Sequence, residues 1–143
     1  MDTPGLARGE RRDGIGSTAE RWARWVVAML DSPTDLKTVR AWARFVAVSP
    51  ATLGETCRLL DIQAHDARDL ARMIRALTMV RRHRLHVEGV LDICDRRTLQ
   101  KLIARAALDD RSLGEISLID FLARQQFVNA DNEGLRALKA LLP

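Results

Sequence analysis

The sequence is poor in several residue types, and these shortages exclude whole classes of protein. Its 143 residues include no Tyr, two Cys and four Pro, and only three of the 23 basic residues are Lys. No stretch approaches the ~18 apolar residues of a transmembrane helix, and the amino terminus lacks the apolar segment of a secretory signal. We therefore expect no membrane span, no secretion and no fibrous structure, and we predict a cytoplasmic location.

Motifs that carry catalysis or metal binding are also missing. There is no phosphate-binding GxxxxGK[ST] loop, no GxGxxG turn and no GxSxG nucleophile motif. Cys57 and Cys94 lie among apolar residues at helical spacing, as buried thiols do. His83 and His86 are three residues apart, but no nearby Cys or carboxylate cluster completes a metal site. The sequence predicts no enzymatic activity, no cofactor and no bound metal.

What the chain does contain is apolar helix-forming sequence and arginine. Hydrophobic residues make up 47% of the sequence and charged residues 29%, enough for an aliphatic core in one domain. The net charge is +4, and residues 63–86 alone carry a net +4 from six Arg and two Asp. Such a concentration is typical of a nucleic-acid surface, although a solvated helix face or the codon usage of a GC-rich genome would also produce it.

The amino-terminal third predicts a leader followed by a helix. Residues 1–16 mix Gly, Pro, Arg and Asp without periodicity, so we expect a flexible leader. Ser17 and Glu20 have the spacing of a capping box that starts a helix. That helix carries Trp22, Trp25 and Met29 on one apolar stripe, so core packing is favoured over a base-stacking platform for these Trp residues and for Trp42.

Two short helices with a capped turn between them follow. A helix with Asp35 as its expected N-cap carries apolar residues on one side, and residues 47–48 form a turn. Ser49 and Pro50 then provide an N-cap and a first-turn proline for a second helix. This spacing predicts a helix-turn-helix unit, with a generic helical hairpin as the alternative.

The next two segments predict a linking helix and a second unit of the same kind. A helix capped by Asp66 and ending near Arg82 places four Arg side chains opposite its apolar stripe: Arg68, Arg72, Arg75 and Arg82. A short helix near residues 87–94 is followed by one capped by Asp95, whose apolar side carries Leu99 and Leu102. Its polar side carries Arg96, Arg97, Thr98, Gln100, Lys101 and Arg105. We therefore predict an all-α protein, with two helix-turn-helix subdomains joined by a long linking helix and followed by a helical C-terminal tail.

Three segments in this order resemble the DNA-binding domain of AraC/XylS-type bacterial transcription regulators. DLKTVRAWARFVAVSPATLGETCRLLDI (residues 35–62) is similar to the first unit of that family, ARDLARMIRALTMV (67–80) to its linking helix, and VEGVLDICDRRTLQKLIARAAL (87–108) to its second unit. The expected boundaries are a leader over 1–16, the double helix-turn-helix domain over 17–108, and a C-terminal extension over 109–143.

The resemblance implies a transcription regulator whose two recognition helices enter successive major grooves about 34–36 Å apart. The second recognition helix is the expected base reader, through Arg97, Thr98, Gln100 and Lys101. Phosphate or backbone contacts are expected from Arg96, Arg105, Arg68, Arg72, Arg75, Thr52 and Arg58. Double-stranded DNA is the expected partner of a monomer or homodimer, and RNA polymerase or another regulator are the further partners considered.

Departures from the family pattern support an alternative function. Ala51, Gly54 and Glu55 occupy positions where the family carries Arg or Gln, and Glu55 would repel phosphate. Asp95 and Arg96 lie where the family has a Gly-Phe pair. The alternative is therefore a protein-interaction module or adaptor with little or no DNA binding. The tail residues Phe121, Leu122 and Phe127 either pack onto the core or form a dimer face, and Asp109 and Asp110 are expected in a loop.

Overall fold

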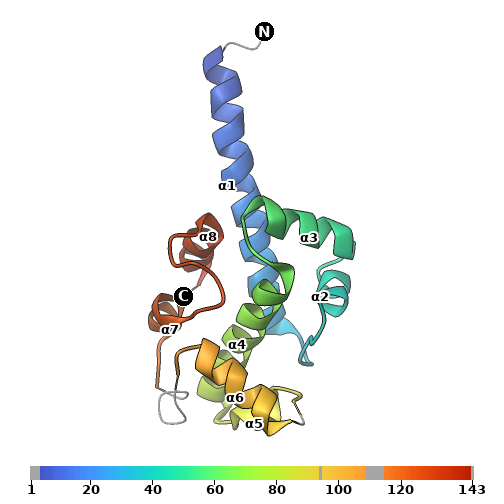
Figure 1. Ribbon diagram of the computed structural model, residues 1–143, viewed down its shortest axis with the longest axis vertical. Coiled ribbons are helices and arrows are strands. Elements are labelled where there is room, and N and C mark those ends of the chain that lie inside the picture. Colours follow the sequence, from blue (N-terminus) through green and yellow to red (C-terminus); the bar gives the residue numbers. More distant parts are fainter. Residues whose placement is uncertain (1–3, 94, 109–114, 143) are drawn as a thin grey trace.

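The computed structural model describes residues 4–93, 95–108 and 115–142, and the regular structure of these residues is helical (Figure 1). The helices are α1 (Pro4–Ala28), the 3-10 helix η1 (Met29–Asp31), α2 (Val39–Phe45), α3 (Pro50–Leu59), α4 (Ala64–His83), α5 (Val87–Val90), α6 (Arg96–Arg105), α7 (Leu118–Arg124) and α8 (Glu133–Leu141). The prediction of an all-α protein is confirmed. Cys94, Asp109 and Asp110 lie outside the described residues.

Helix α4 runs through the centre of the molecule. It contacts α1, α2, α3 and η1 along one part of its length, and α5 and α7 along another. Leu70, Met73, Ile74 and Leu77 are fully buried, as the predicted apolar stripe requires. The burial extends around the whole helix, because every residue from 70 to 78 is buried. A helix covered on all sides has no free polar face, and this changes the role of its arginines.

Helix α1 begins at Pro4, so the prediction of a flexible leader over 1–16 is wrong for residues 4–16. Proline is well tolerated in the first turn of a helix, because its missing N–H needs no partner there. Ser17 is exposed within α1 and caps nothing, and the Thr18 hydroxyl donates to the Gly14 carbonyl at 2.6 Å. In Figure 1 the first half of α1 projects away from the rest of the molecule.

The second half of α1 supplies much of the core. Trp22 and Trp25 are buried, as the apolar stripe predicts, and so is Trp42 of α2. The Trp42 indole N–H donates to the Trp25 carbonyl at 3.0 Å, which satisfies its polar atom inside the core. All three Trp residues are therefore core residues and not an exposed stacking platform.

The carboxyl-terminal segment completes this same core. Helix α8 packs along α1, and Leu135 and Leu138 are fully buried. Gly134 permits the close approach, since a Cβ at this position would lie 2.8 Å from Cε3 of Trp22. Phe121, Leu122 and Phe127 are also buried in the core. Of the two roles considered for these three residues, packing onto the core is the one the structure shows.

The predicted N-caps of two helices are confirmed. The Ser49 side chain accepts a hydrogen bond from the Thr52 N–H at 3.0 Å, with Pro50 in the first turn of α3. The Asp95 carboxylate accepts one from the Arg97 N–H at 3.0 Å at the start of α6. Both side chains replace partners that the first backbone N–H groups of a helix lack.

Two other predicted caps are wrong, because each Asp is used elsewhere. Helix α2 begins at Val39, and Thr38 caps it by accepting from the Ala41 N–H at 3.0 Å. Helix α4 begins at Ala64, after an N-cap residue that makes no side-chain cap hydrogen bond. Asp35 and Asp66 instead form ion pairs with arginines 37 and 39 residues further along the chain.

Candidate nucleic-acid interface

Helices α2 and α3 pack against each other and are joined by the tight turn of residues 46–49. Ala47 has a left-handed backbone conformation with φ of 61°. The Val48 N–H donates to the Ala43 carbonyl at 3.0 Å, which closes the end of α2 in a Schellman arrangement. Ala43 and Leu53 are fully buried, so the pair has its own apolar contact. This geometry presents the outer side of α3 to solvent.

The outer side of α3 carries little net charge. Ala51, Thr52, Glu55 and Arg58 are exposed. The Arg58 guanidinium donates to both oxygens of Glu55, and this hydrogen bond is the main reason that the pKa of Glu55 lies below its usual value. The Thr52 hydroxyl lies 2.8 Å from that of Ser49 within the cap. The predicted contact residues Thr52 and Arg58 are thus accessible, but a carboxylate already compensates the charge of Arg58.

The outer side of α6 carries a different set of groups. Leu99, Leu102 and Ala106 face the core, and the residues predicted to read bases are all exposed, namely Arg97, Thr98, Gln100 and Lys101. Arg97, Gln100, Lys101 and Ala104 follow one another at spacings of three, one and three, which places them on one stripe of the helix. Arg96 is exposed beside this stripe.

The cations of this stripe are not paired within the described part of the chain. Arg96, Arg97 and Lys101 have no carboxylate within ion-pair distance there. The Thr98 hydroxyl donates to the Asp95 carboxylate at 2.9 Å. This bond, and next the Arg97 N–H, lower the pKa of Asp95. Helix α6 thus combines a firmly capped start with three solvent-exposed cations that form no close ion pair in the described residues, although Lys101 contributes to lowering the pKa of Asp95.

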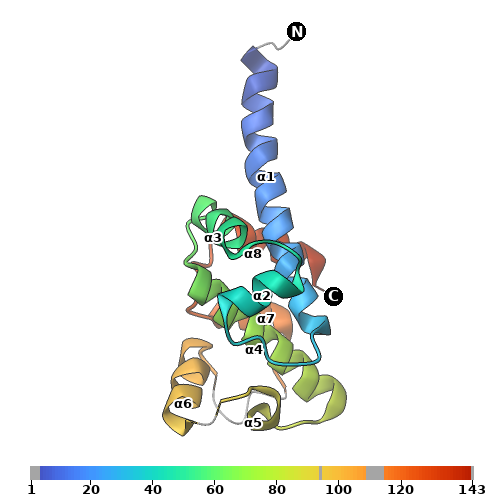
Figure 2. The same cartoon turned by 90° about the vertical axis from the view of Figure 1, so that its right-hand side faces the viewer.

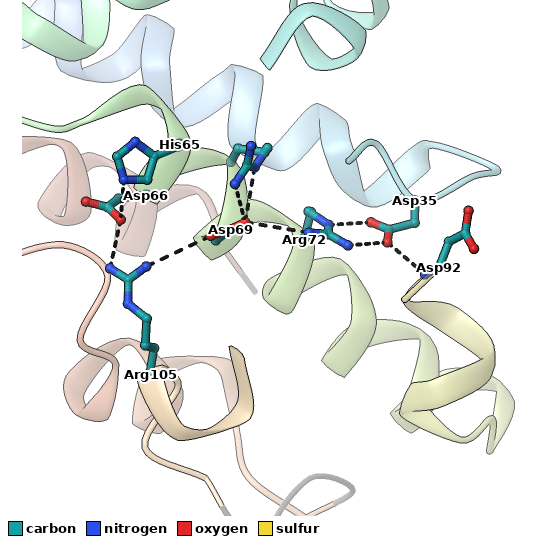
Figure 3. Close-up of polar contacts among 8 residues, drawn as sticks. Asp35, His65, Asp66, Asp69, Arg72, Asp92 and Arg105 are labelled. Carbon is teal, nitrogen blue, oxygen red and sulfur yellow. Dashed lines mark hydrogen bonds and ion pairs between the residues drawn. The ribbon is translucent and has the colours of Figure 1, made fainter. Parts of the chain in front are cut away.

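Two arginines predicted to bind phosphate are buried instead. Arg72 and Arg75 of α4 are only 7% and 2% exposed. Arg72 binds Asp35 through two hydrogen bonds, at 2.8 Å from Nε and 2.7 Å from Nη2 (Figure 3). Arg75 donates to the carbonyls of Ser32 and Val90 at 3.0 and 3.3 Å. The predicted phosphate roles of Arg72 and Arg75 are therefore wrong, because other elements pack onto that side of α4.

Arg68 and Arg105 are also engaged inside the protein. Arg68 pairs with Asp69 at 3.0 Å. Arg105 pairs with Asp66 at 2.8 Å, and its guanidinium lies 4.7 Å from the ring centre of Phe127. Their charges are compensated by neighbouring carboxylates, so neither adds a free cation to the surface of α6.

Sequence reasoning missed two exposed cations on α2. Arg40 and Arg44 are four residues apart and exposed, on the side opposite the buried Trp42 and Ala43. Their helical spacing was the signal that would have identified them. These two side chains thus add exposed positive charge to the α2–α3 pair.

Figure 2 shows α3 and α6 on the same side of the molecule, one above the other, with the start of α4 between them. The end of α4 lies on the opposite side; its last turn carries the exposed Arg81 and Arg82, and the exposed Arg84 follows it. The net charge of residues 63–86 thus divides into buried arginines and a cluster remote from α6. The candidate interface consists of α6 with the outer sides of α2 and α3.

Helix α5 is a single turn, so the element that precedes α6 is shorter than predicted. No helix of the described residues has the length and apolar character of a membrane span. Comparison with protein-family models, curated proteins and solved structures finds no match to this chain.

Proposed function

We propose that this chain is a sequence-specific DNA-binding protein of the helix-turn-helix type that regulates transcription, as its resemblance to AraC/XylS-type regulators implies. The observation that carries the proposal is the exposed face of α6. Arg96, Arg97 and Lys101 are exposed to solvent and form no ion pair within 4.0 Å in the described chain, on a helix whose other side is buried, and Lys101 is close enough to Asp95 to help lower its pKa. A rigid helix with such a face fits the major groove of a DNA duplex.

Each group on α6 has a role suited to its chemistry. Arg97 and Lys101 can donate to the O6 and N7 atoms of guanine, and Gln100 can bind adenine through its amide. Thr98 remains the candidate for contact with a thymine methyl, since its hydroxyl is held by Asp95. Arg96 at the start of the helix is better suited to phosphate, which positions the protein without specifying sequence.

The α2–α3 pair would bind DNA mainly by contacting the phosphate backbone of the duplex. Arg40 and Arg44 replace the buried arginines of α4 as candidate phosphate contacts of the first unit. The Glu55–Arg58 pair leaves α3 with little charge for base recognition. We therefore expect an asymmetric site, in which the bases facing α6 are strongly specified and those facing α3 only weakly.

Selection of bound sequences from a random duplex pool tests the proposal. We expect one enriched motif, and Arg97→Ala should relax one position of it at a cost of about 1–3 kcal/mol. Arg82→Ala is the matched control, because Arg82 is an exposed arginine on the opposite side of the molecule. A pool without enrichment, together with no salt-dependent binding at about 50 mM salt, would overturn the proposal.

One observation favours a second candidate, a protein-interaction module. Leu59 of α3, which follows Arg58 of the nearly neutral Glu55–Arg58 pair, is 59% exposed, and Phe45 of α2 is 40% exposed. Exposed apolar side chains are typical of a protein contact. In that case RNA polymerase or another regulator would bind the α2–α3 unit, and Leu59→Ser would abolish the contact without changing binding to DNA.

A further inference from the structure

The ion pairs that engage the arginines of α4 and α6 form one continuous series, which we call the ionic ladder. Its members are Arg105, Asp66, Asp69, Arg72 and Asp35 (Figure 3). Arg105 belongs to α6, the next three residues belong to α4, and Asp35 lies in the segment that leads into α2. The ladder therefore links the two parts of the candidate interface along the helix that separates them.

Asp69 lies at the centre of the ladder. Its carboxylate lies 3.0 Å from Arg68, 3.6 Å from Arg72 and 3.9 Å from Arg105. The Asp69 side chain is 14% exposed, so its contacts are partly shielded from water. Such contacts are stronger than those of fully exposed ion pairs, because a lower effective dielectric screens them less.

The far end of the ladder continues into the segment that follows α5. Asp35 is 1% exposed at its side chain and accepts a hydrogen bond from the Asp92 N–H at 2.8 Å. Asp92 in turn pairs with Lys37 at 2.9 Å. The segment before α6 is thus tied to Asp35 and Lys37 ahead of α2, while Arg105 at the end of α6 is tied to α4.

Helix α6 depends on these charged contacts for its orientation. Its apolar attachment consists of a few buried side chains, chiefly Leu99 and Leu102, and non-directional packing of this kind permits rotation and sliding. Arg105 supplies directional bonds at the end of the helix, and its backbone carbonyl accepts from the Gln126 N–H at 2.7 Å. Removing the ladder should therefore loosen α6 before it destabilises the rest of the core.

We propose that Asp69 is a positioning residue, which with Asp66 holds α6 through Arg105 and through Arg72 fixes it relative to the α2–α3 unit. The consequence of this inference for DNA binding rests on the proposed function. If the chain binds DNA as proposed, the ladder would set the separation and angle at which the two units meet the duplex. The geometry of the ladder itself does not depend on that function.

Hydrogen exchange measured by mass spectrometry on the full chain tests the inference without DNA. In Asp69→Asn we expect the α6 amides to exchange about two- to fivefold faster than in the wild type, as for loss of a partly exposed ion pair, because Arg105 and Asp69 are 3.9 Å apart. The α1 and α8 amides should change less than about twofold. Asp66→Asn, which leaves Asp69 with Arg72 in place, should accelerate α6 alone.

A matched control and a salt series sharpen the test. Glu55→Gln removes an ion pair on the surface of α3 and should leave α6 exchange unchanged. Raising the salt concentration from about 0.05 to about 0.5 M should accelerate α6 exchange in the wild type but not in the Asp66→Asn/Asp69→Asn variant, because Arg105 is partly exposed and its pairs are screened. Unchanged α6 exchange in this double variant, or equal acceleration of every helix, would overturn the inference.

A DNA measurement separates the inference from the proposed function. One base pair inserted between the two halves of a selected site should weaken wild-type binding at least tenfold and weaken Asp69→Asn binding less, because a loosened α6 adapts to the new spacing. Equal losses for both proteins would contradict the positioning role of Asp69. Failure of the wild type to bind any duplex would contradict the proposed function, and the exchange experiment would still decide the role of the ladder.

Discussion

Replacing Arg72 by Met would leave the Asp35 carboxylate without its cationic partner. The Arg72 side chain is 8% exposed and that of Asp35 is 1% exposed, and two hydrogen bonds of 2.8 and 2.7 Å join them. Breaking a buried pair in this way costs about 3–5 kcal/mol, because the remaining charge is buried and unpaired. Since Asp35 keeps its bond from the Asp92 N–H, we expect about 3 kcal/mol, the lower end of that range.

A double variant shows whether the loss of unfolding free energy arises from the unpaired Asp35 carboxylate. Asp35→Asn removes the charge and keeps an oxygen that can accept from the Asp92 N–H. The Arg72→Met/Asp35→Asn variant should therefore recover much of the loss, since replacing both members of a buried ion pair is often close to neutral. Arg82→Met is the surface control and should change the free energy of unfolding by less than about 0.5 kcal/mol.

Urea unfolding followed by tryptophan fluorescence provides the measurement, because all three Trp residues are buried. In a parallel thermal unfolding experiment, Arg72→Met should lower Tm by roughly 6–12 °C for a chain of this size. The reasoning would be refuted by an unfolding free energy within about 0.5 kcal/mol of the wild type, the range of ordinary surface substitutions. If the double variant is as unstable as Arg72→Met, the unpaired Asp35 carboxylate is not the cause of the loss.

Three further predictions concern other parts of the molecule. Gly134→Ala should destabilise the protein by about 1–3 kcal/mol, because the added Cβ would meet Trp22. Gly14→Ala is the control: a Cβ there meets open space and should stabilise α1. Thermal unfolding of both variants would show the difference. Ala47→Gly should raise the unfolding free energy by up to about 1 kcal/mol in urea titrations, since φ is 61° there. Burial raises the pKa of the Cys57 thiol to about 11, so stability should fall between about pH 9 and pH 11, where the unfolded thiol has already lost its proton. Urea titrations at several pH values across that range should show that the unfolding free energy of Cys57→Ala falls less steeply with pH than that of the wild type.

Local signals in the sequence were sufficient for part of the fold. Ser49 and Asp95 cap α3 and α6 as predicted, because an N-cap needs only a side chain two or three residues from its partner. The apolar stripe of α4 and the burial of the Trp residues also follow from helical periodicity. The exposed face of α6 was found for the same reason, since its polar side is simply the side opposite Leu99 and Leu102.

The arginines of α4 were misassigned because their partners are distant in sequence. A helical wheel separates apolar from polar residues on one helix, but it contains no information about what packs on the polar side. Arg72 finds Asp35 from 37 residues earlier, and Arg105 finds Asp66 from 39 residues earlier. Asp35 and Asp66 were interpreted as helix caps for the same reason. Contacts of this range depend on the tertiary arrangement, which local patterns do not specify.

Titration of a labelled duplex carrying the selected motif tests the central claim most directly. Fluorescence anisotropy would compare the wild type, the Arg97→Ala/Lys101→Ala variant and the Arg82→Ala control in about 50 mM salt. We expect tight, salt-dependent binding by the wild type and the control, and a loss of at least about tenfold in the double variant. Equal binding by all three proteins, or no binding by the wild type, would contradict the assignment of α6 as the DNA-reading helix.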